Sequence, residues 1–172
     1  MGHNDGGLGF LVGEFLTWLW FEGERTGGVV QADGVGAVSV GFVRKLVLES
    51  PGVIVEGHTV SADMPTLADE ARTALKTGKK VALASLVLDV EDRHFEATVH
   101  AETMTLRSVK LPVVLTAEDV EQLDERLVLL DELEMIVDGL YLTYARLRLN
   151  SERWLETRAA MTAWVQSGSE AE

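Results

Sequence analysis

The chain has 172 residues, of which 28 are acidic and 15 are basic, so its formal net charge is −13 at pH 7. This balance argues against broad electrostatic binding to nucleic acid or to an anionic membrane, although it leaves room for a local basic patch. The chain contains no cysteine, which excludes disulfides, thiolate metal sites and cysteine nucleophiles. The proportions of hydrophobic residues (47%) and charged residues (25%) are typical of a globular protein.

The first expected element is a helix over residues 8–22, which is apolar around almost its whole circumference. Glu14 and Thr17 share one narrow polar face. A helix of this kind is buried in a core or in an interface, and it is too short to span a membrane. The aromatic side chains, including Trp18 and Trp20, could stack on bases, but their helical spacing favours core or interface packing. We therefore expect a cytoplasmic protein without membrane contact.

The next segment carries turn and strand signals. The Asp-Gly pair at 33–34 predicts a hairpin between strands at 29–31 and 35–40. A further strand is expected over 42–48. After the Ser-Pro-Gly turn at 50–52, another short strand is expected to begin with Val53, Ile54 and Val55.

A short helix is expected over 66–77, with Thr66 and Asp69 resembling a capping box and Gly78 as the stop. Leu67, Ala71, Ala74 and Leu75 form its predicted apolar stripe. Residues 80–111 then indicate three strands with short links, which is typical of an antiparallel meander.

The last part of the chain predicts a very long helix that is capped by Thr116 and broken near Asn150, with Ser151 capping a second helix. Apolar residues recur every three or four positions from Val120 to Leu147, as in a helix that packs one stripe against a partner. Residues 117–138 hold nine acids and one base, whereas residues 139–165 hold four arginines and two glutamates. Favourable interaction with the helix dipole accounts for part of this asymmetry.

These elements predict an α+β fold. An antiparallel sheet is packed by an aromatic N-terminal helix and a short helix, with a long C-terminal helical arm. The predicted organisation is a flexible leader at 1–7, the sheet region at 8–116, the helical arm at 117–166 and a tail at 167–172.

No catalytic or metal-binding pattern is found, and we expect neither an enzyme nor a cofactor. His58, His94 and His100 lack metal-ligand spacing, so a structural role is favoured for them. The acids at 89, 91 and 92 lack the spacing and the glycine of a calcium loop. An Mg²⁺-dependent nuclease would need a carboxylate cluster that the sequence does not indicate.

The basic residues are more informative. Several of them fall near the end of the short helix and on expected strands, where they could contact phosphates. They could equally complement the helix C-terminus and keep a sheet face solvated. The candidate DNA-binding residues are Lys79, Lys80, Lys76, Arg72, Arg44, Lys45, Arg107 and Lys110.

Two stretches of the chain resemble the bacterial recombination-associated RdgC family. The first is the segment GEFLTWLWFE at 13–22, and the second is a run of short motifs in the order found in the C-terminal half of that family. This run comprises Gly52-Val53-Ile54, Ala71 and Leu75 on the short helix, GKKV at 78–81, the strand at 83–88, Phe95 and the strand at 106–111.

The resemblance covers most of residues 13–148 and implies a cytoplasmic or nucleoid-associated protein that dimerises into a ring. Such a protein binds double-stranded DNA with little sequence preference and restrains a RecA-type recombinase. Lys79 and Lys80 match the Gly-Lys turn of the family, and Lys110 falls near its basic strand end. Family members carry a substantial region before this one, so the chain corresponds to their C-terminal portion, as a fragment or as a shortened relative. The charge of −13 departs from what an unassisted DNA ring needs.

Two hypotheses follow for the function. The first is a non-catalytic, RdgC-like protein that binds double-stranded DNA without sequence specificity as a homodimer. The second is an acidic interaction or oligomerisation module without direct DNA contact, whose partner is a second copy, a missing N-terminal region or a basic protein. The interface residues expected in either case are Trp18, Trp20, Leu127, Leu130, Val137 and Tyr144.

Overall fold

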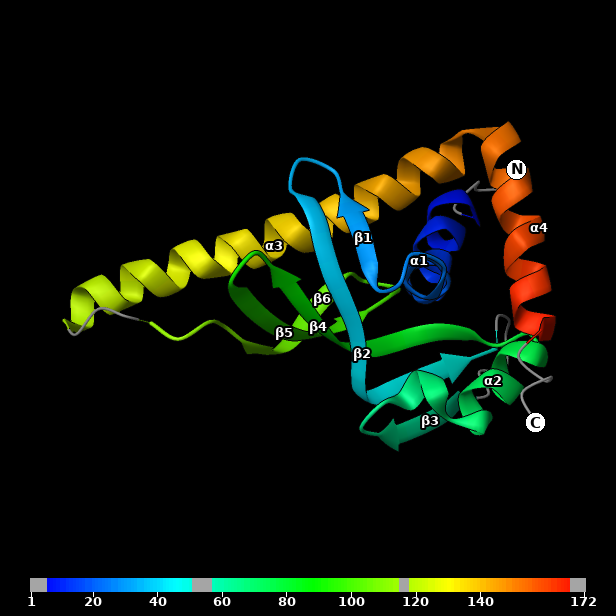
Figure 1. The fold of residues 1–172 in the computed structure, drawn as a ribbon, viewed down its shortest axis with the longest axis horizontal. Helices are drawn as coiled ribbons and strands as arrows, with labels where there is room; N and C mark the ends of the chain where they lie inside the picture. Colours follow the sequence, from blue (N-terminus) through cyan, green and yellow to red (C-terminus); the bar gives the residue numbers. More distant parts are fainter. Residues whose placement is uncertain (1–5, 51–56, 115–117, 168–172) are drawn as a thin grey trace.

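The computed structural model describes residues 6–50, 57–114 and 118–167, and an antiparallel sheet lies at their centre (Figure 1). Within these ranges the sheet has six strands: β1 (Val29–Ala32), β2 (Gly36–Glu49), β4 (Lys80–Val90), β5 (Arg93–His100) and β6 (Thr105–Lys110) in order of pairing, and β3 (Gly57–Ala62) beside β2. The described helices are α1 (Gly6–Arg25), α2 (Asp69–Lys76), α3 (Asp119–Leu149) and α4 (Ser151–Ser167), with a 3-10 turn, η1 (Pro65–Leu67). The α+β class, the antiparallel sheet and the long C-terminal helix are confirmed.

The meander predicted for residues 80–111 is present as β4, β5 and β6. A tight turn at residues 91–92 pairs Asp89 with His94, and Phe95, Ala97 and Val99 point into the core. The alternation of apolar and polar residues along β5 therefore separates a helix-covered face of the sheet from a polar face.

The strands before the meander differ from the prediction. The hairpin turn at 33–34 is correct, but the two strands expected over 35–48 are a single bent strand, β2, with an irregular register between Phe42 and Leu46. The strand expected at 53–55 lies outside the described residues. Strand β3 was not predicted, because its polar residues give no periodic apolar signal.

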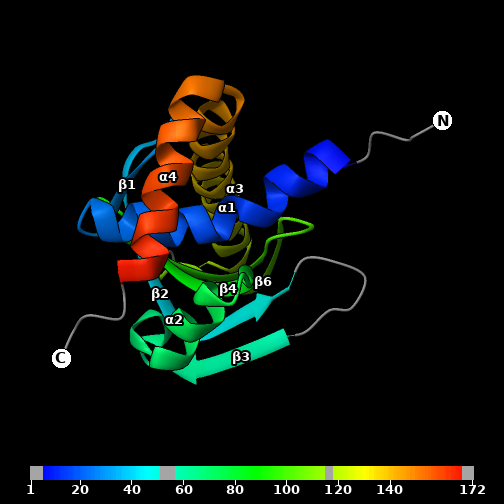
Figure 2. The ribbon, with the colours of Figure 1, turned by 90° about the vertical axis from the view of Figure 1, so that its right-hand side faces the viewer.

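The aromatic helix α1 crosses the helix-covered face of the sheet (Figure 2). Phe15 and Trp18 are buried, and both rings lie against Tyr144 of α3, with centroid distances of 5.7 and 5.5 Å. The narrow polar face of α1 meets the start of β4, because Thr17 Oγ1 accepts a 2.9 Å hydrogen bond from the Val81 N–H and Glu14 pairs with Lys80. The helix begins at Gly6, two residues earlier than expected. In the described part of the chain, no helix is both long enough and apolar enough to cross a membrane.

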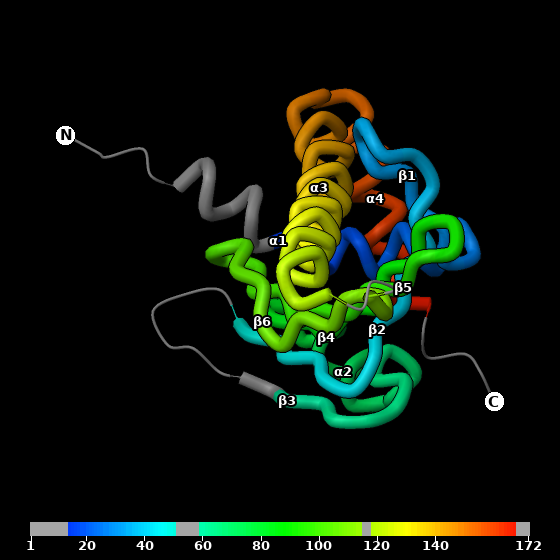
Figure 3. Tube along the Cα trace, turned by 90° about the vertical axis from the view of Figure 1, so that its left-hand side faces the viewer, coloured from blue at the N-terminus to red at the C-terminus, as the bar shows by residue number. Residues whose placement is uncertain are grey.

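Helix α3 lies over the sheet with its axis along the long dimension of the molecule (Figures 1 and 3). Its approach to the β1–β2 turn is very close, because the Asp33 N–H donates to the Gly139 carbonyl at 2.9 Å and to Thr143 Oγ1 at 3.1 Å. The Thr143 hydroxyl in turn donates to the Gln31 carbonyl at 2.8 Å, and Arg146 pairs with Asp33 at 3.0 Å. A Cβ at residue 139 would lie 2.6 Å from the Asp33 carbonyl oxygen, so only glycine permits this contact.

The short helix α2 begins later than the sequence predicts. Pro65 initiates η1, and α2 begins only at Asp69, with Ala68 at the N-cap and no side-chain cap, so the predicted Thr66 capping box does not form. Leu67, expected in the apolar stripe, is exposed, whereas Ala71, Ala74 and Leu75 are buried as predicted.

The break between the C-terminal helices is at Asn150, as expected, but Ser151 is not the cap. The Asn150 side-chain oxygen accepts a 3.1 Å hydrogen bond from the Arg153 N–H, which is the usual N-cap arrangement. Thr116, the predicted cap of the long helix, lies outside the described residues. Helix α4 turns back to reach α2 (Figure 2), which gives α4 a partner at each end.

We expect Gly139→Ala to lower the free energy of unfolding by about 1–3 kcal/mol, since the added methyl group collides with backbone rather than with a mobile side chain. Urea denaturation measures the change. Gly23→Ala in α1 is the matched control, because its Cβ meets nothing within 4 Å. The free energy of unfolding of this control is expected to rise by up to about 1 kcal/mol, because alanine has a higher helix propensity than glycine. Equal effects of the two substitutions would contradict the role of Gly139.

Candidate functional site

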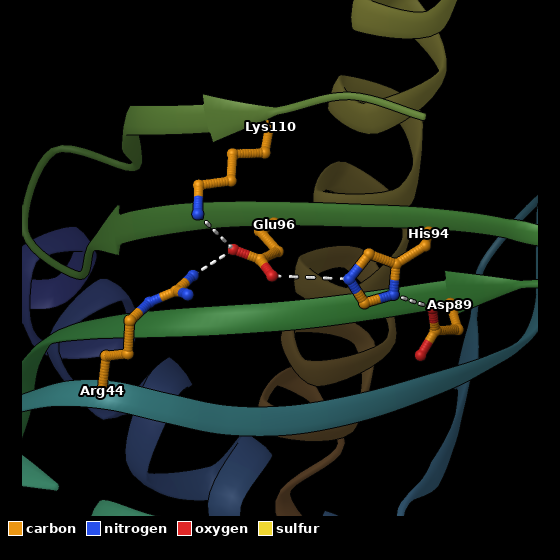
Figure 4. Close-up of polar contacts among 5 residues, drawn as sticks. All are labelled: Arg44, Asp89, His94, Glu96 and Lys110. Atoms are coloured by element: carbon orange, nitrogen blue, oxygen red, sulfur yellow. Dashed lines mark hydrogen bonds and ion pairs between the residues drawn. The ribbon is translucent and has the colours of Figure 1, made fainter. Parts of the chain in front are cut away.

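The polar face of the sheet, opposite α1 and α3, carries the main cluster of charged side chains (Figure 4). We call it the outer sheet face and define it by twelve outward residues of four strands around Glu96 and His94; Glu49, at the end of β2 beside Lys80, lies outside this set. The twelve are Ser39, Gly41, Arg44 and Lys45 of β2; Ser85, Val87 and Asp89 of β4; His94, Glu96 and Thr98 of β5; and Arg107 and Lys110 of β6. Four cations against two carboxylates give this face a net charge of +2, in a chain whose total is −13.

Glu96 is the centre of the cluster. Its Oε2 accepts from the Arg44 guanidinium and lies 3.4 Å from Lys110 Nζ, so two cations from strands on either side converge on one carboxylate (Figure 4). The hydrogen bond from Arg44 is the main reason why the pKa of Glu96 is lowered. Beside this pair, a groove of about 250 Å³ is lined by Lys45 and by the hydroxyls of Ser85 and Thr98 among others. The groove therefore combines three cations, hydroxyl groups and a single carboxylate.

Two backbone irregularities shape this site. Arg44 (φ 60°) and Ser108 (φ 50°) both adopt the left-handed conformation that non-glycine residues rarely take. Each lies at a register shift, between Phe42 and Leu46 in β2 and opposite the Glu96–Thr98 step in β6. Bulges of this kind redirect side chains. Here one bulge contains Arg44 and the other lies two residues before Lys110, and these are the two cations that meet at Glu96.

His94 lies between two carboxylates. Its Nδ1 is 2.6 Å from Asp89 Oδ1, and its Nε2 is 3.4 Å from Glu96 Oε1. The hydrogen bond to Asp89 is the main cause of a raised pKa of His94, and Glu96 adds to it. Acidification therefore makes the outer sheet face more positive.

The arrangement suits ionic binding better than catalysis. An Asp–His pair activates a nucleophile when a hydroxyl faces the second ring nitrogen, but here a carboxylate occupies that position. Among the described residues, no group of three or more metal-ligating side chains could hold an ion. What the outer sheet face offers is a set of long cationic side chains on a rigid platform, which suits contacts to phosphates.

The structure divides the eight predicted DNA-binding residues between two regions. Arg44, Lys45, Arg107 and Lys110 lie on the outer sheet face. Lys80 instead pairs with Glu14 on the helix-covered side, and Lys79 lines a cavity next to it. Arg72 and Lys76 belong to α2.

Arg72 is held in a contact that joins three helices. Its guanidinium binds both oxygens of Glu24 of α1 at 2.6 and 2.7 Å, and its central carbon lies 5.3 Å from the Trp20 ring and 5.0 Å from the Trp164 ring of α4. Both indoles also donate to Glu24, at 2.9 and 2.6 Å. This cluster stabilises the packing of α1, α2 and α4, so Arg72 has a structural role whether or not it contacts a ligand.

The predicted interface residues also fall into two sets. Trp18, Trp20, Val137 and Tyr144 are buried within this chain, so their burial does not require a partner. Burial raises the pKa of the Tyr144 hydroxyl, which is consistent with an apolar surrounding. Leu130 is half-buried and Leu127 is 51% exposed. A role for these residues in an interface stays a prediction, and it is best supported for Leu127.

A larger cavity, of about 570 Å³, lies between α1, α3 and α4 and has Trp18 and Phe21 in its wall. Three arginines and three carboxylates surround it. Two of these arginines are already paired, with Glu22 at 2.5 Å and with Asp33 at 3.0 Å. The cavity is therefore electrically balanced and does not extend the cationic surface.

Two features of the site were not found from the sequence. The Asp89–His94 pair could have been found, because a turn at residues 91–92 places these residues opposite one another. The convergence of Arg44 and Lys110 could not, because neither Arg44 nor Ser108 is a residue type that signals a left-handed bulge.

No family model matches this chain, and no curated protein or solved structure matches it either.

We expect the pKa of His94 to lie above its ordinary value of 6.5 and to fall towards 6.5 in Asp89→Asn, as measured by NMR titration of the ring protons. Glu91→Gln, which removes a nearby carboxylate that does not bind His94, is the control and should change little. Because the folded-state pKa is raised, protonated His94 stabilises the fold fully below pH 6.5, and this contribution is lost as the pH rises through the raised value. Its size is about a few tenths of a kcal/mol, since the side chain is 56% exposed. An unchanged titration in Asp89→Asn would contradict the assignment.

Proposed function

We propose that this protein is a non-catalytic DNA-associated protein that binds double-stranded DNA without sequence specificity through its outer sheet face. The observation that carries the proposal is the local charge of +2 on this face of a strongly acidic chain. Arg44, Lys45, Arg107 and Lys110 would contact phosphates, which are attracted most strongly at low salt. The rest of the surface, with its excess of acids, would repel DNA and so restrict binding to this face.

The composition of the face supports binding without sequence preference. Between the cations it has small or hydroxyl-bearing side chains, such as Gly41, Ser85 and Thr98, and the outer sheet face as defined has no phenylalanine, tyrosine or tryptophan on which a base could stack. Cations that contact phosphates fix the position of a protein on DNA but carry no sequence information. Sequence-specific contacts in a groove would need a projecting helix or ribbon with side chains that reach base edges.

The resemblance to the RdgC family points to the same class of ligand and to a homodimer in the cytoplasm or at the nucleoid. We include the homodimer in the proposal, and sedimentation velocity of the full chain tests it directly. Of the three residues that the resemblance implies, the proposal keeps Lys110 but not Lys79 or Lys80, because Lys80 is paired with Glu14 and Lys79 lines the cavity beside that pair.

We expect Lys45→Gln/Arg107→Gln to weaken duplex binding and to reduce the slope of log K against log salt by roughly two units, about 0.9 for each phosphate that the protein no longer neutralises. Neither residue has an ion pair with another described residue, so the fold should be unaffected. Fluorescence anisotropy with a labelled duplex, titrated from low salt upwards, measures the slope.

The matched control is Lys76→Gln/Lys79→Gln, which removes the same charge from the region of α2. It should leave the slope unchanged. Absence of duplex binding at the lowest salt, or an equal reduction in both double variants, would refute binding through the outer sheet face.

A further inference from the structure

Helix α3 exposes a long apolar face. We call this face the outer stripe, and its members are between 43% and 75% exposed: Val120, Leu123, Leu127, Val128, Met135, Leu142 and Leu149. At 100° per residue these positions fall within roughly 140° of the helix circumference. Seven large apolar side chains on one exposed face are more than scattered surface residues would provide.

The body of the protein cannot cover the outer stripe. The buried residues of α3 begin at Leu133 and include Ile136, Leu140 and Tyr144, and they lie on the opposite side of the helix. The first part of α3 has no buried residue and extends beyond the sheet (Figure 1). Among the residues that the structure describes, none covers the outer stripe.

Acidic residues are interleaved with the outer stripe at regular spacing. Val128, Met135, Leu142 and Leu149 recur every seven residues, and Asp124, Asp131 and Asp138 recur every seven residues beside them. In a coiled-coil arrangement, the apolar series takes one seam position and the aspartates take the other. A partner helix would thus meet alternating apolar and negatively charged layers.

A second copy is a poor occupant of this face. A parallel pair would bring aspartate against aspartate, and an antiparallel pair would bring aspartate against an apolar side chain, which leaves buried charge without compensation. Arg126 is the single base among residues 117–138, against nine acids. Charge complementarity instead requires lysine or arginine opposite the aspartates, whose long stems can cover apolar surface while their charged ends pair.

We propose that the outer stripe of α3 is a docking site for an amphipathic helix of another protein, with basic residues at seven-residue spacing beside its apolar residues. This site is separate from the outer sheet face. Its aspartates lie in the acidic segment at 117–138, which a DNA contact would avoid, so the two proposals succeed or fail independently.

The test uses three synthetic 28-residue helical peptides. The binding of each peptide to the full chain is measured by isothermal titration calorimetry. The first has leucine at one seam position of the heptad and lysine at the other, the second has glutamate in place of lysine, and the third is a scramble of the first with equal charge. We expect the leucine–lysine peptide alone to bind, with an affinity that falls as salt is raised. Failure of that peptide to bind at low salt, or equal binding of the scramble, would overturn the proposal.

Two sets of variants locate the site. Asp124→Asn/Asp131→Asn/Asp138→Asn should weaken peptide binding about tenfold. Its control, Glu70→Gln/Glu152→Gln/Glu156→Gln, removes three exposed carboxylates elsewhere and should have no effect. Met135→Gln/Leu142→Gln should abolish binding, whereas Leu155→Gln, an exposed apolar position on α4, should not.

The same variants distinguish a second copy from a basic helix. If sedimentation velocity shows a dimer that Met135→Gln/Leu142→Gln dissociates, a second copy occupies the outer stripe and the proposal is wrong. A monomer, or a dimer that survives these substitutions, together with binding of the leucine–lysine peptide, supports it.

Discussion

The close contact between Gly139 and the β1–β2 turn determines how α3 lies on the rest of the molecule. The backbone of Asp33 donates to α3 at a distance that no side chain at residue 139 would allow. The contact fixes the rotation of α3 about its axis, because Thr143 and Arg146, one and two turns further on, also bind the hairpin. Once that rotation is fixed, Tyr144 points into the aromatic core and the outer stripe points away from it.

The sheet has a similarly clear division into two faces. Phe95, Ala97 and Val99 of β5 pack against the helices, and Glu96 and Thr98 between them belong to the polar face. Because side chains alternate along a strand, burial of one set forces the other set outwards. The bulges at Arg44 and Ser108 then bring cations from β2 and β6 to the same carboxylate, at the energetic cost of two left-handed residues.

Charge is thus separated within one chain. The outer sheet face has a net positive charge, whereas residues 117–138, which include the first two thirds of α3, hold nine acids and one base. A local cationic surface on an acidic protein restricts the orientation in which a polyanion can approach, and the acidic helix favours a basic partner. Ion pairs such as Lys80–Glu14 and Arg72–Glu24 show that some of the basic residues serve the fold instead.

The sequence by itself determined the elements whose periodicity is strong. The meander of β4 to β6, the hairpin turn at 33–34 and the break at Asn150 follow from local patterns and turn residues, which act over a few positions. The sequence also identified the eight basic residues, but it could not tell which of them share a face. Strand pairing brings Arg44 within reach of Glu96, 52 residues away, and the packing of α1 places Glu14 beside Lys80. The division of the eight, the bulges and the exposure of the outer stripe depend on contacts between distant segments, and local propensity contains no information about those contacts.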